Sequence, residues 1–227
     1  MKTKKSAKIV ETNFDIAYLC VAYIITMILF ISSYPPSNLR WQFAVVALIL
    51  AIGDTFHLIP RVRIMWNESG GYTRWLGFGK LVSSLTMTVF YLGLWHIGAN
   101  VYGINNMFLL IFMIILAVLR IVLCLMPQNK WLLDASPYKW QIIRNIPFII
   151  MCLLVMVLFI FGTFGSRLNT TDTQGLNYLW LAILISILCY LPVILFANKY
   201  PKIGMLMIPK TCAYIAILLM GFSIPVV

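Results

Sequence analysis

Seven runs of mostly apolar residues, each about 20 residues long, occupy most of this 227-residue sequence. A helix needs about 20 apolar residues to cross the roughly 30 Å hydrocarbon core of a bilayer. The runs cover residues 14–33, 41–60, 79–98, 106–125, 143–165, 177–196 and 203–222. Short polar connectors rich in Pro, Gly and Asn separate them. The sequence therefore predicts an all-α polytopic membrane protein, with seven transmembrane helices in a single integral membrane domain of residues 1–227.

The composition supports a membrane protein and excludes several other classes. Hydrophobic residues make up 62% of the chain and charged residues 10%, whereas a soluble domain has about 45–50% and about 25%. This composition excludes a soluble globular domain, a disordered chain and a nucleic-acid-binding domain. The net charge of +11 is therefore interpreted as a signal of membrane orientation rather than of a nucleic-acid partner.

Lysines and arginines are distributed unevenly between the two predicted sides of the membrane. Eleven lie before the first run or in connectors on one side, namely Lys2, Lys4, Lys5, Lys8, Arg61, Arg63, Arg74, Lys130, Lys139, Lys199 and Lys202. The other side carries Arg40 and Arg167, and the segment after the last run carries none. Because positive charge is retained on the cytoplasmic side, the sequence predicts a cytoplasmic N-terminus and an external C-terminus. The predicted location is the cytoplasmic membrane of a bacterial cell, which the chain crosses several times.

Charged side chains inside the apolar runs are the first candidates for function. A charge at the centre of a spanning helix costs about 2.5–3.5 kcal/mol, so it usually faces a partner or a water-filled cavity. Asp54 and His57 fall on one helix face with Arg61. Asp54 is about 10 Å from the predicted cytoplasmic edge, and Lys210 in the last run lies at a similar depth.

Further polar side chains lie in the same inner third of the predicted bilayer. Arg120 is about 9 Å from the cytoplasmic edge. The remaining candidates for ligand binding are Arg61, Lys80, Ser84, Tyr91 and Tyr214. Because Asp54 can neutralise only one cation, convergence of these groups would create a site with surplus positive charge. Such a site favours an anionic ligand with a phosphate or carboxylate headgroup.

These residues are compatible with three different functions. In the leading hypothesis the protein is an intramembrane, hydrolase-like enzyme that acts on a lipid or amphiphile near the cytoplasmic leaflet. Asp54 and His57 would then do acid–base work on a bound water or hydroxyl, while Lys210 and Arg120 hold an anionic headgroup. The first alternative is a transporter or receptor for a small anionic ligand. The second is a non-catalytic scaffold, in which charges such as Asp54 and Lys210 only join helices.

The sequence predicts no metal site and no cofactor. Its two histidines, His57 and His96, lie at opposite membrane faces, so a three-histidine zinc site is not available. The five cysteines are scattered singly within the apolar runs, which indicates no disulfide framework. The predicted partners are the lipid bilayer and a lipid or small anionic ligand, and the pattern does not indicate an oligomeric state.

One segment resembles a known family. The run from Ala44 to Ile52, followed by Gly53 and Asp54, is similar to the Gly-Asp signature of the lysoplasmalogenase-like bacterial membrane proteins, which are compact multi-helix proteins of similar size. The resemblance implies a hydrolase that acts on the vinyl-ether bond of lysoplasmalogens, with Asp54 as one of its acidic residues. Where the pattern of that family expects a second buried aspartate late in the chain, this sequence has Lys210.

Overall fold

A computed structural model of the chain describes residues 2–33, 38–66, 72–104, 106–133, 136–165, 171–196 and 199–224. Helices are the only regular elements in these ranges. The α-helices are α1 (Lys2–Ser32), α2 (Leu39–Trp66), α3 (Tyr72–Tyr102), α4 (Met107–Leu125), α5 (Tyr138–Gly165), α6 (Leu179–Phe196) and α7 (Met207–Met220). The 3-10 helices are η1 (Pro127–Asn129), η2 (Thr171–Tyr178), η3 (Pro201–Leu206) and η4 (Gly221–Ser223).

Seven helical segments in the described ranges are long and apolar enough to cross a membrane. This finding confirms the predicted all-α fold with seven helices that are able to cross a membrane. Several helices extend beyond the predicted runs: α1 begins at Lys2, α2 continues to Trp66, α3 begins at Tyr72 and α5 begins at Tyr138. Hydropathy locates only the apolar part of a helix, whereas polar turns at its ends still form backbone hydrogen bonds.

Two of the predicted runs begin as 3-10 helix rather than α-helix. The run 177–196 is entered through η2, and the run 203–222 begins in η3 and becomes α-helical at Met207. Because 3-10 turns are tighter than α-turns, the change at Met207 fixes the direction of the first α-helical turn of α7. Lys210 lies in that turn.

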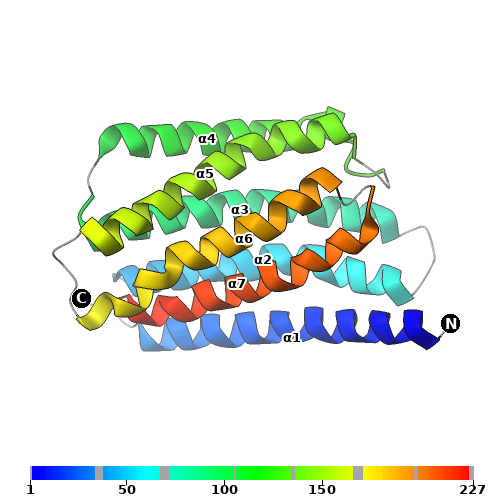
Figure 1. Ribbon diagram of the computed structural model, residues 1–227, viewed down its shortest axis with the longest axis horizontal. Coiled ribbons are helices and arrows are strands. Elements are labelled where there is room, and N and C mark those ends of the chain that lie inside the picture. Colours follow the sequence, from blue (N-terminus) through cyan, green and yellow to red (C-terminus); the bar gives the residue numbers. More distant parts are fainter. Residues whose placement is uncertain are drawn as a thin grey trace.

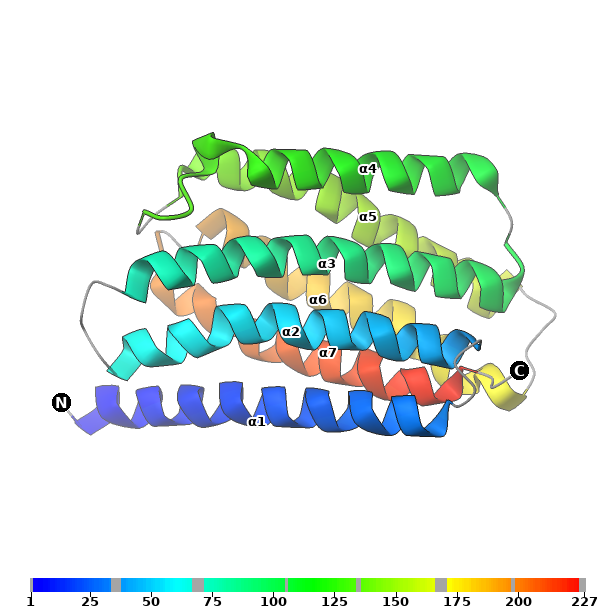
Figure 2. The same cartoon turned by 180° about the vertical axis from the view of Figure 1, so that it is seen from behind.

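The seven helices form a closed ring of neighbours. Each helix contacts the next along the chain, α7 contacts α1, and α3 also packs against α5 across the bundle (Figures 1 and 2). The first residues of α1 lie at one end of the bundle and the last residues of α7 at the other. We call the former the N-terminal end of the bundle, where the α2–α3, α4–α5 and α6–α7 connections also lie.

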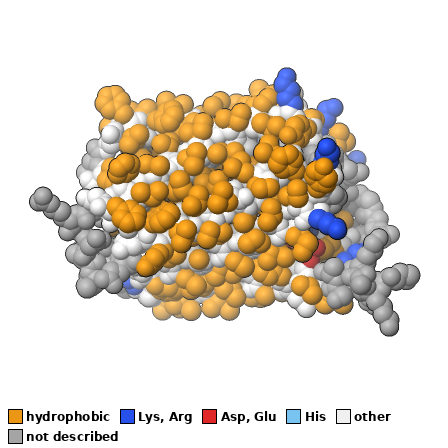
Figure 3. Space-filling model, in the orientation of Figure 1, with side chains coloured by type: hydrophobic (Ala, Val, Ile, Leu, Met, Phe, Trp, Pro, Cys, Tyr) orange, Lys and Arg blue, Asp and Glu red, His pale blue; other side chains and the backbone are white. Residues whose placement is uncertain are grey.

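The surface follows the charge pattern of the sequence. Figure 3 shows hydrophobic side chains over most of one face, with Lys and Arg gathered toward the N-terminal end. Arg40, at the opposite end, donates to the carbonyl oxygens of Phe222 and Ile224 at 2.8 Å each. Arg167 and the side chains of Lys2, Lys4 and Lys5, which also entered the charge count, lie outside the described residues.

The half of the bundle away from the N-terminal end has a filled interior. Its fully buried side chains come from all seven α-helices, and they include Leu29, Phe43, Ala47, Leu94, Met113, Val155, Phe159, Ile183 and Ile217. Apolar side chains packed at this density leave little space for water. The interior nearer the N-terminal end is different, because polar side chains face it.

Candidate functional site

A cavity of about 730 Å³ occupies the half of the bundle nearer the N-terminal end. All seven α-helices contribute lining side chains, and so does Trp131 from the α4–α5 connection. The lining reaches the molecular surface at Val10 of α1 and Met205 of η3, which are 62% and 70% exposed. Lys80 of α3 is also exposed there. The cavity is therefore a chamber with charged side chains in its lining, and it opens beside apolar surface.

Most of the residues that the sequence singled out meet in this cavity. Eight of the nine line it, namely Asp54, His57, Arg61, Lys80, Ser84, Arg120, Lys210 and Tyr214. Tyr91 does not. It is 1% exposed and packs edge-to-face against the lining residue Phe148, with ring centroids 5.2 Å apart. Tyr91 therefore belongs to the layer behind the cavity wall.

Asp54 is held by two hydroxyl groups. Tyr18 of α1 donates to its Oδ2 at 2.6 Å, and Ser83 of α3 donates to its Oδ1 at 3.4 Å. Neutral hydroxyl donors stabilise a buried carboxylate without cancelling its charge. Within the described residues no ion pair joins Asp54 to Lys210, so these two charges do not form the helix-joining contact that the scaffold hypothesis considered.

His57 faces the same cavity but is not bonded to Asp54. Its Nδ1 is buried and has no hydrogen-bond partner among the described side chains and backbone. The two residues share a helix face, as their spacing predicted, yet the carboxylate turns toward Tyr18 and Ser83. An imidazole nitrogen without a partner keeps the capacity to form one further hydrogen bond.

The position of α2 depends on a close approach to α3. A Cβ at Gly79 would lie 1.9 Å from the backbone oxygen of Phe56, the residue before His57. Only glycine allows the two backbones to approach this closely. The contact therefore sets the depth at which Asp54 and His57 enter the cavity.

Two of the cations that the sequence singled out lie over aromatic rings. The guanidinium carbon of Arg120 lies 3.4 Å from the ring centroid of Phe148. The Nζ of Lys210 lies 4.5 Å from the ring centroid of Tyr190 and 5.0 Å from that of Tyr214. Such cation–π contacts offset part of the cost of burying the charges. They do not provide counter-charges.

Arg120 is the most strongly buried cation of the site. It is 2% exposed, and its Nε and Nη1 atoms have no hydrogen-bond partner among the described residues. A buried charge without a carboxylate partner is costly. The positive charge of Arg120 is therefore not neutralised by any described carboxylate in the cavity wall.

Arg144 of α5 is a cavity residue that the sequence analysis missed. Its Nη1 donates to Asn129 Oδ1 at 2.9 Å, and its Cζ lies 3.9 Å from the Trp131 ring centroid. Asn129 in turn donates to the carbonyl oxygens of Leu123 at 2.6 Å and Met126 at 3.0 Å. These bonds attach the α4–α5 connection to the end of α4. Arg144 lies at the start of its apolar run, close to the predicted membrane edge. Its depth therefore did not mark it as a charge inside the membrane.

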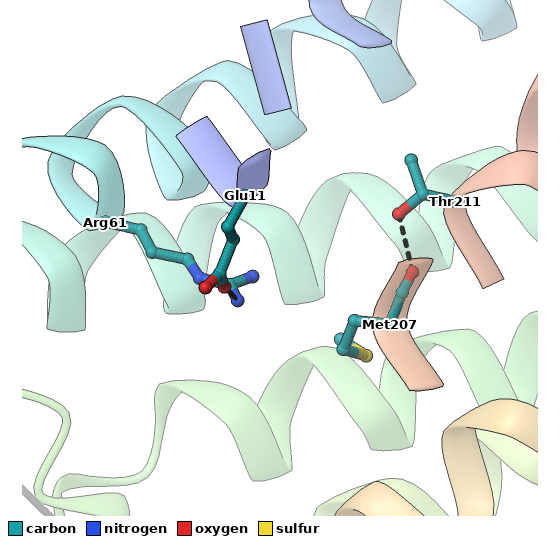
Figure 4. Close-up of polar contacts among 4 residues, drawn as sticks. All are labelled: Glu11, Arg61, Met207 and Thr211. Atoms are coloured by element: carbon teal, nitrogen blue, oxygen red, sulfur yellow. Dashed lines mark hydrogen bonds and ion pairs between the residues drawn. The ribbon is translucent and has the colours of Figure 1, made fainter. Parts of the chain in front are cut away.

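Three polar residues of α1 also line the cavity and were missed. Glu11 forms an ion pair with Arg61 of α2 (Figure 4). Asp15 is 6% exposed, and its Oδ2 has no hydrogen-bond partner in the described structure. Glu11, Asp15 and Tyr18 are spaced by about one turn, and this spacing is the sequence signal that could have identified the face.

Thr211 is a polar residue of the cavity lining whose side chain forms a hydrogen bond within its own helix. Its hydroxyl donates to the carbonyl oxygen of Met207 at 2.8 Å (Figure 4). Bonds of this kind are common for hydroxyl side chains in apolar helices. Ser84 forms a similar bond to the carbonyl oxygen of Lys80 at 2.8 Å, so its hydroxyl hydrogen is directed to the helix rather than to the cavity.

The lining carries more positive than negative charge. It contains five Lys or Arg side chains and three Asp or Glu side chains, which is a formal excess of two positive charges. The carboxylates come from α1 and α2, whereas Arg120, Arg144 and Lys210 come from α4, α5 and α7. The cavity therefore has an acidic side and a basic side.

No protein-family model, no curated protein and no solved structure matches this chain. Within the described residues there is no group of three or more His, Cys, Asp or Glu side chains that could hold a metal ion.

Proposed function

We propose that the protein is an intramembrane, hydrolase-like enzyme that acts on a lipid or another amphiphile with an anionic headgroup. The observation that carries the proposal is Arg120, a buried cation on the wall of a 730 Å³ cavity whose Nε and Nη1 atoms have no partner in the described structure. A bound phosphate or carboxylate would supply the counter-charge and the hydrogen-bond acceptors that Arg120 lacks.

The opening of the cavity suits an amphiphile. Val10 and Met205 are exposed apolar side chains beside it, and α7 diverges from α1 toward this end of the bundle (Figures 1 and 2). A headgroup can occupy the charged chamber while its chains remain against apolar surface. If the N-terminus is cytoplasmic, as the Lys and Arg distribution favours, the substrate comes from the cytoplasmic leaflet of the cell membrane.

Asp54 and His57 provide the acid–base groups of this proposal. They line the cavity from α2, whereas Arg120 and Lys210, the cations that would hold the headgroup, come from α4 and α7. His57 accepts a proton from a bound water as the water oxygen attacks the substrate, and the leaving group then takes up that proton. Asp54, with its two hydroxyl donors, supplies negative charge that stabilises the protonated imidazole.

The filled interior of the opposite half favours an enzyme over a transporter. Leu50, Phe90 and Met151 are 0% exposed and close the described interior beyond the cavity. A transporter would need a path through this layer. A substrate that enters and leaves at one end needs none.

Lipid turnover tests the proposal directly. The purified protein, in detergent micelles, is incubated with a bacterial polar lipid extract, and consumed species are identified by mass spectrometry. We expect consumption by the unchanged protein and by Arg74→Gln, an exposed arginine outside the cavity. His57→Gln should be at least about 100-fold slower, because general acid–base catalysis contributes about 10²–10⁴-fold.

The same experiment can refute the proposal. Consumption at equal rates by His57→Gln, Asp54→Asn and the unchanged protein would overturn the assigned roles. If no lipid is consumed but anionic lipids stabilise the protein against heat, the receptor or transporter alternative replaces the enzyme. If neither occurs, the cavity is structural.

A further inference from the structure

We propose that Arg120, Arg144 and Lys210 form a binding site for a dianionic phosphate monoester, which we call the phosphate site. The inference rests on the proposed function in one respect, namely that an anionic headgroup enters this cavity. It goes further by selecting a phosphate monoester over a phosphate diester or a carboxylate.

Arg120 and Lys210 share one aromatic support. Arg120 stacks on Phe148 at 3.4 Å, and Lys210 lies over Tyr190 at 4.5 Å. The two rings meet edge-to-face, with centroids 5.7 Å apart. The pair of rings therefore holds cations from α4 and α7 at neighbouring positions on the cavity wall.

Arg144 is attached to the same framework. The Tyr190 hydroxyl donates to Oδ1 of Asn145, the next residue, at 2.9 Å. On its other side Arg144 is fixed by Asn129 and by the Trp131 ring. Aromatic and amide groups thus position all three cations. A ligand therefore binds at little cost in side-chain conformational entropy.

The stacked arrangement leaves hydrogen-bond donors for a ligand. Ring contacts occupy the flat faces of the Arg120 and Arg144 guanidinium groups, whereas the N–H bonds point outward in the guanidinium plane. None of the three cations forms an ion pair with a carboxylate in the described structure. Planar guanidinium groups bind two phosphate oxygens at once, and a lysine adds a third, mobile donor.

The charge balance selects the class of anion. Arg120, Arg144 and Lys210 carry three positive charges, and no described carboxylate forms an ion pair with them. A phosphate monoester carries about −1.5 to −2 near neutral pH. It therefore neutralises more of this charge than a phosphate diester or a carboxylate, each of which carries one negative charge. The carboxylates of the cavity belong to α1 and α2, not to the helices that carry the phosphate site.

Binding of matched lipids tests this selection. The full-length protein in detergent is titrated calorimetrically with lysophosphatidic acid (a monoester), lysophosphatidylglycerol (a diester) and a fatty acid of the same chain. We expect the dissociation constant of the monoester to be at least about tenfold lower than that of either monoanion. Glycerol 3-phosphate and inorganic phosphate, tested as competitors, distinguish a lipid headgroup from a free phosphate.

Matched variants locate the phosphate site. Arg144→Gln and Arg120→Gln should reduce the preference for the monoester to less than about threefold, and Arg74→Gln should preserve it. If Arg120→Gln fails to fold, Arg144→Lys keeps the charge but loses the planar fork. We expect it to show an intermediate preference.

The outcomes separate the two proposals. Equal affinity for monoester, diester and fatty acid overturns the phosphate site but leaves the proposed function standing. A preference for the monoester that survives both arginine variants also overturns the assignment. If glycerol 3-phosphate binds as tightly as the lipid, the phosphate site stands and the amphiphile proposal fails. If no anion binds, both fail.

Discussion

At the scale of single residues, the cavity keeps several charges without direct counter-charges. Asp54 is held by the hydroxyls of Tyr18 and Ser83, and Lys210 by two aromatic rings. A direct Asp54–Lys210 ion pair would satisfy both groups and leave neither for a ligand. In the observed arrangement neither Asp54 nor Lys210 has a direct counter-charge among the described residues. This is expected of a site whose charges are neutralised by a bound ligand.

Removal of the Tyr18 hydroxyl tests the importance of its bond to Asp54. Tyr18→Phe should reduce the free energy of unfolding by about 1.5–3 kcal/mol, because the bond is buried and its acceptor is ionisable. Tyr23→Phe is the matched control, since the Tyr23 hydroxyl meets the neutral Thr55 Oγ1 at 3.0 Å; its loss should cost about 1 kcal/mol. The measurement is reversible unfolding in mixed micelles. Equal losses in the two variants would contradict a special role for Tyr18.

At the scale of helices, the close approach of two backbones positions Asp54 and His57. α2 and α3 approach each other closely at Gly53 and at Gly79, and the atoms nearest to each glycine differ. A Cβ at Gly53 would meet the side chain of Thr86, which can rotate, whereas one at Gly79 would meet the backbone of Phe56. Only the second contact requires the helices themselves to separate.

Gly79→Ala should therefore displace α2 from α3 and destabilise the bundle. Overpacking in a close-packed interior costs typically about 1–3 kcal/mol, which thermal unfolding in detergent will detect. Gly165→Ala, at the end of α5 with no atom of the described residues within 4 Å of its Cβ position, is the control and should be near neutral. If Gly79→Ala melts at the same temperature as Gly165→Ala, the close approach is not needed for stability.

At the scale of the whole molecule, hydropathy was sufficient to predict the membrane-spanning helices. It was not sufficient to predict how each helix is rotated about its own axis. The apolar runs predicted seven membrane-spanning helices because hydrocarbon requires continuous apolar length. Helix rotation is poorly encoded, because lipid-facing and core-facing residues are both apolar and the helical period is weak. Depth alone brought Asp54, Lys210 and Arg120 to one level. It gave no reason to include Arg144 or Tyr18, and the helical spacing that grouped Tyr91 with Lys80 and Ser84 did not show that Tyr91 lies behind the cavity wall.

The orientation of the molecule is the last prediction, and it determines which leaflet the cavity serves. The Lys and Arg distribution favours a cytoplasmic N-terminal end. A membrane-impermeant maleimide applied to intact cells should therefore label Met107→Cys, at the start of α4, but not Lys139→Cys, at the start of α5. Both positions are exposed, so permeabilised cells should show labelling of both variants. The unchanged protein controls for the native cysteines. Labelling of only Lys139→Cys in intact cells would reverse the orientation and transfer the proposed substrate to the outer leaflet, while the arrangement of Asp54, His57 and the phosphate site would remain the same.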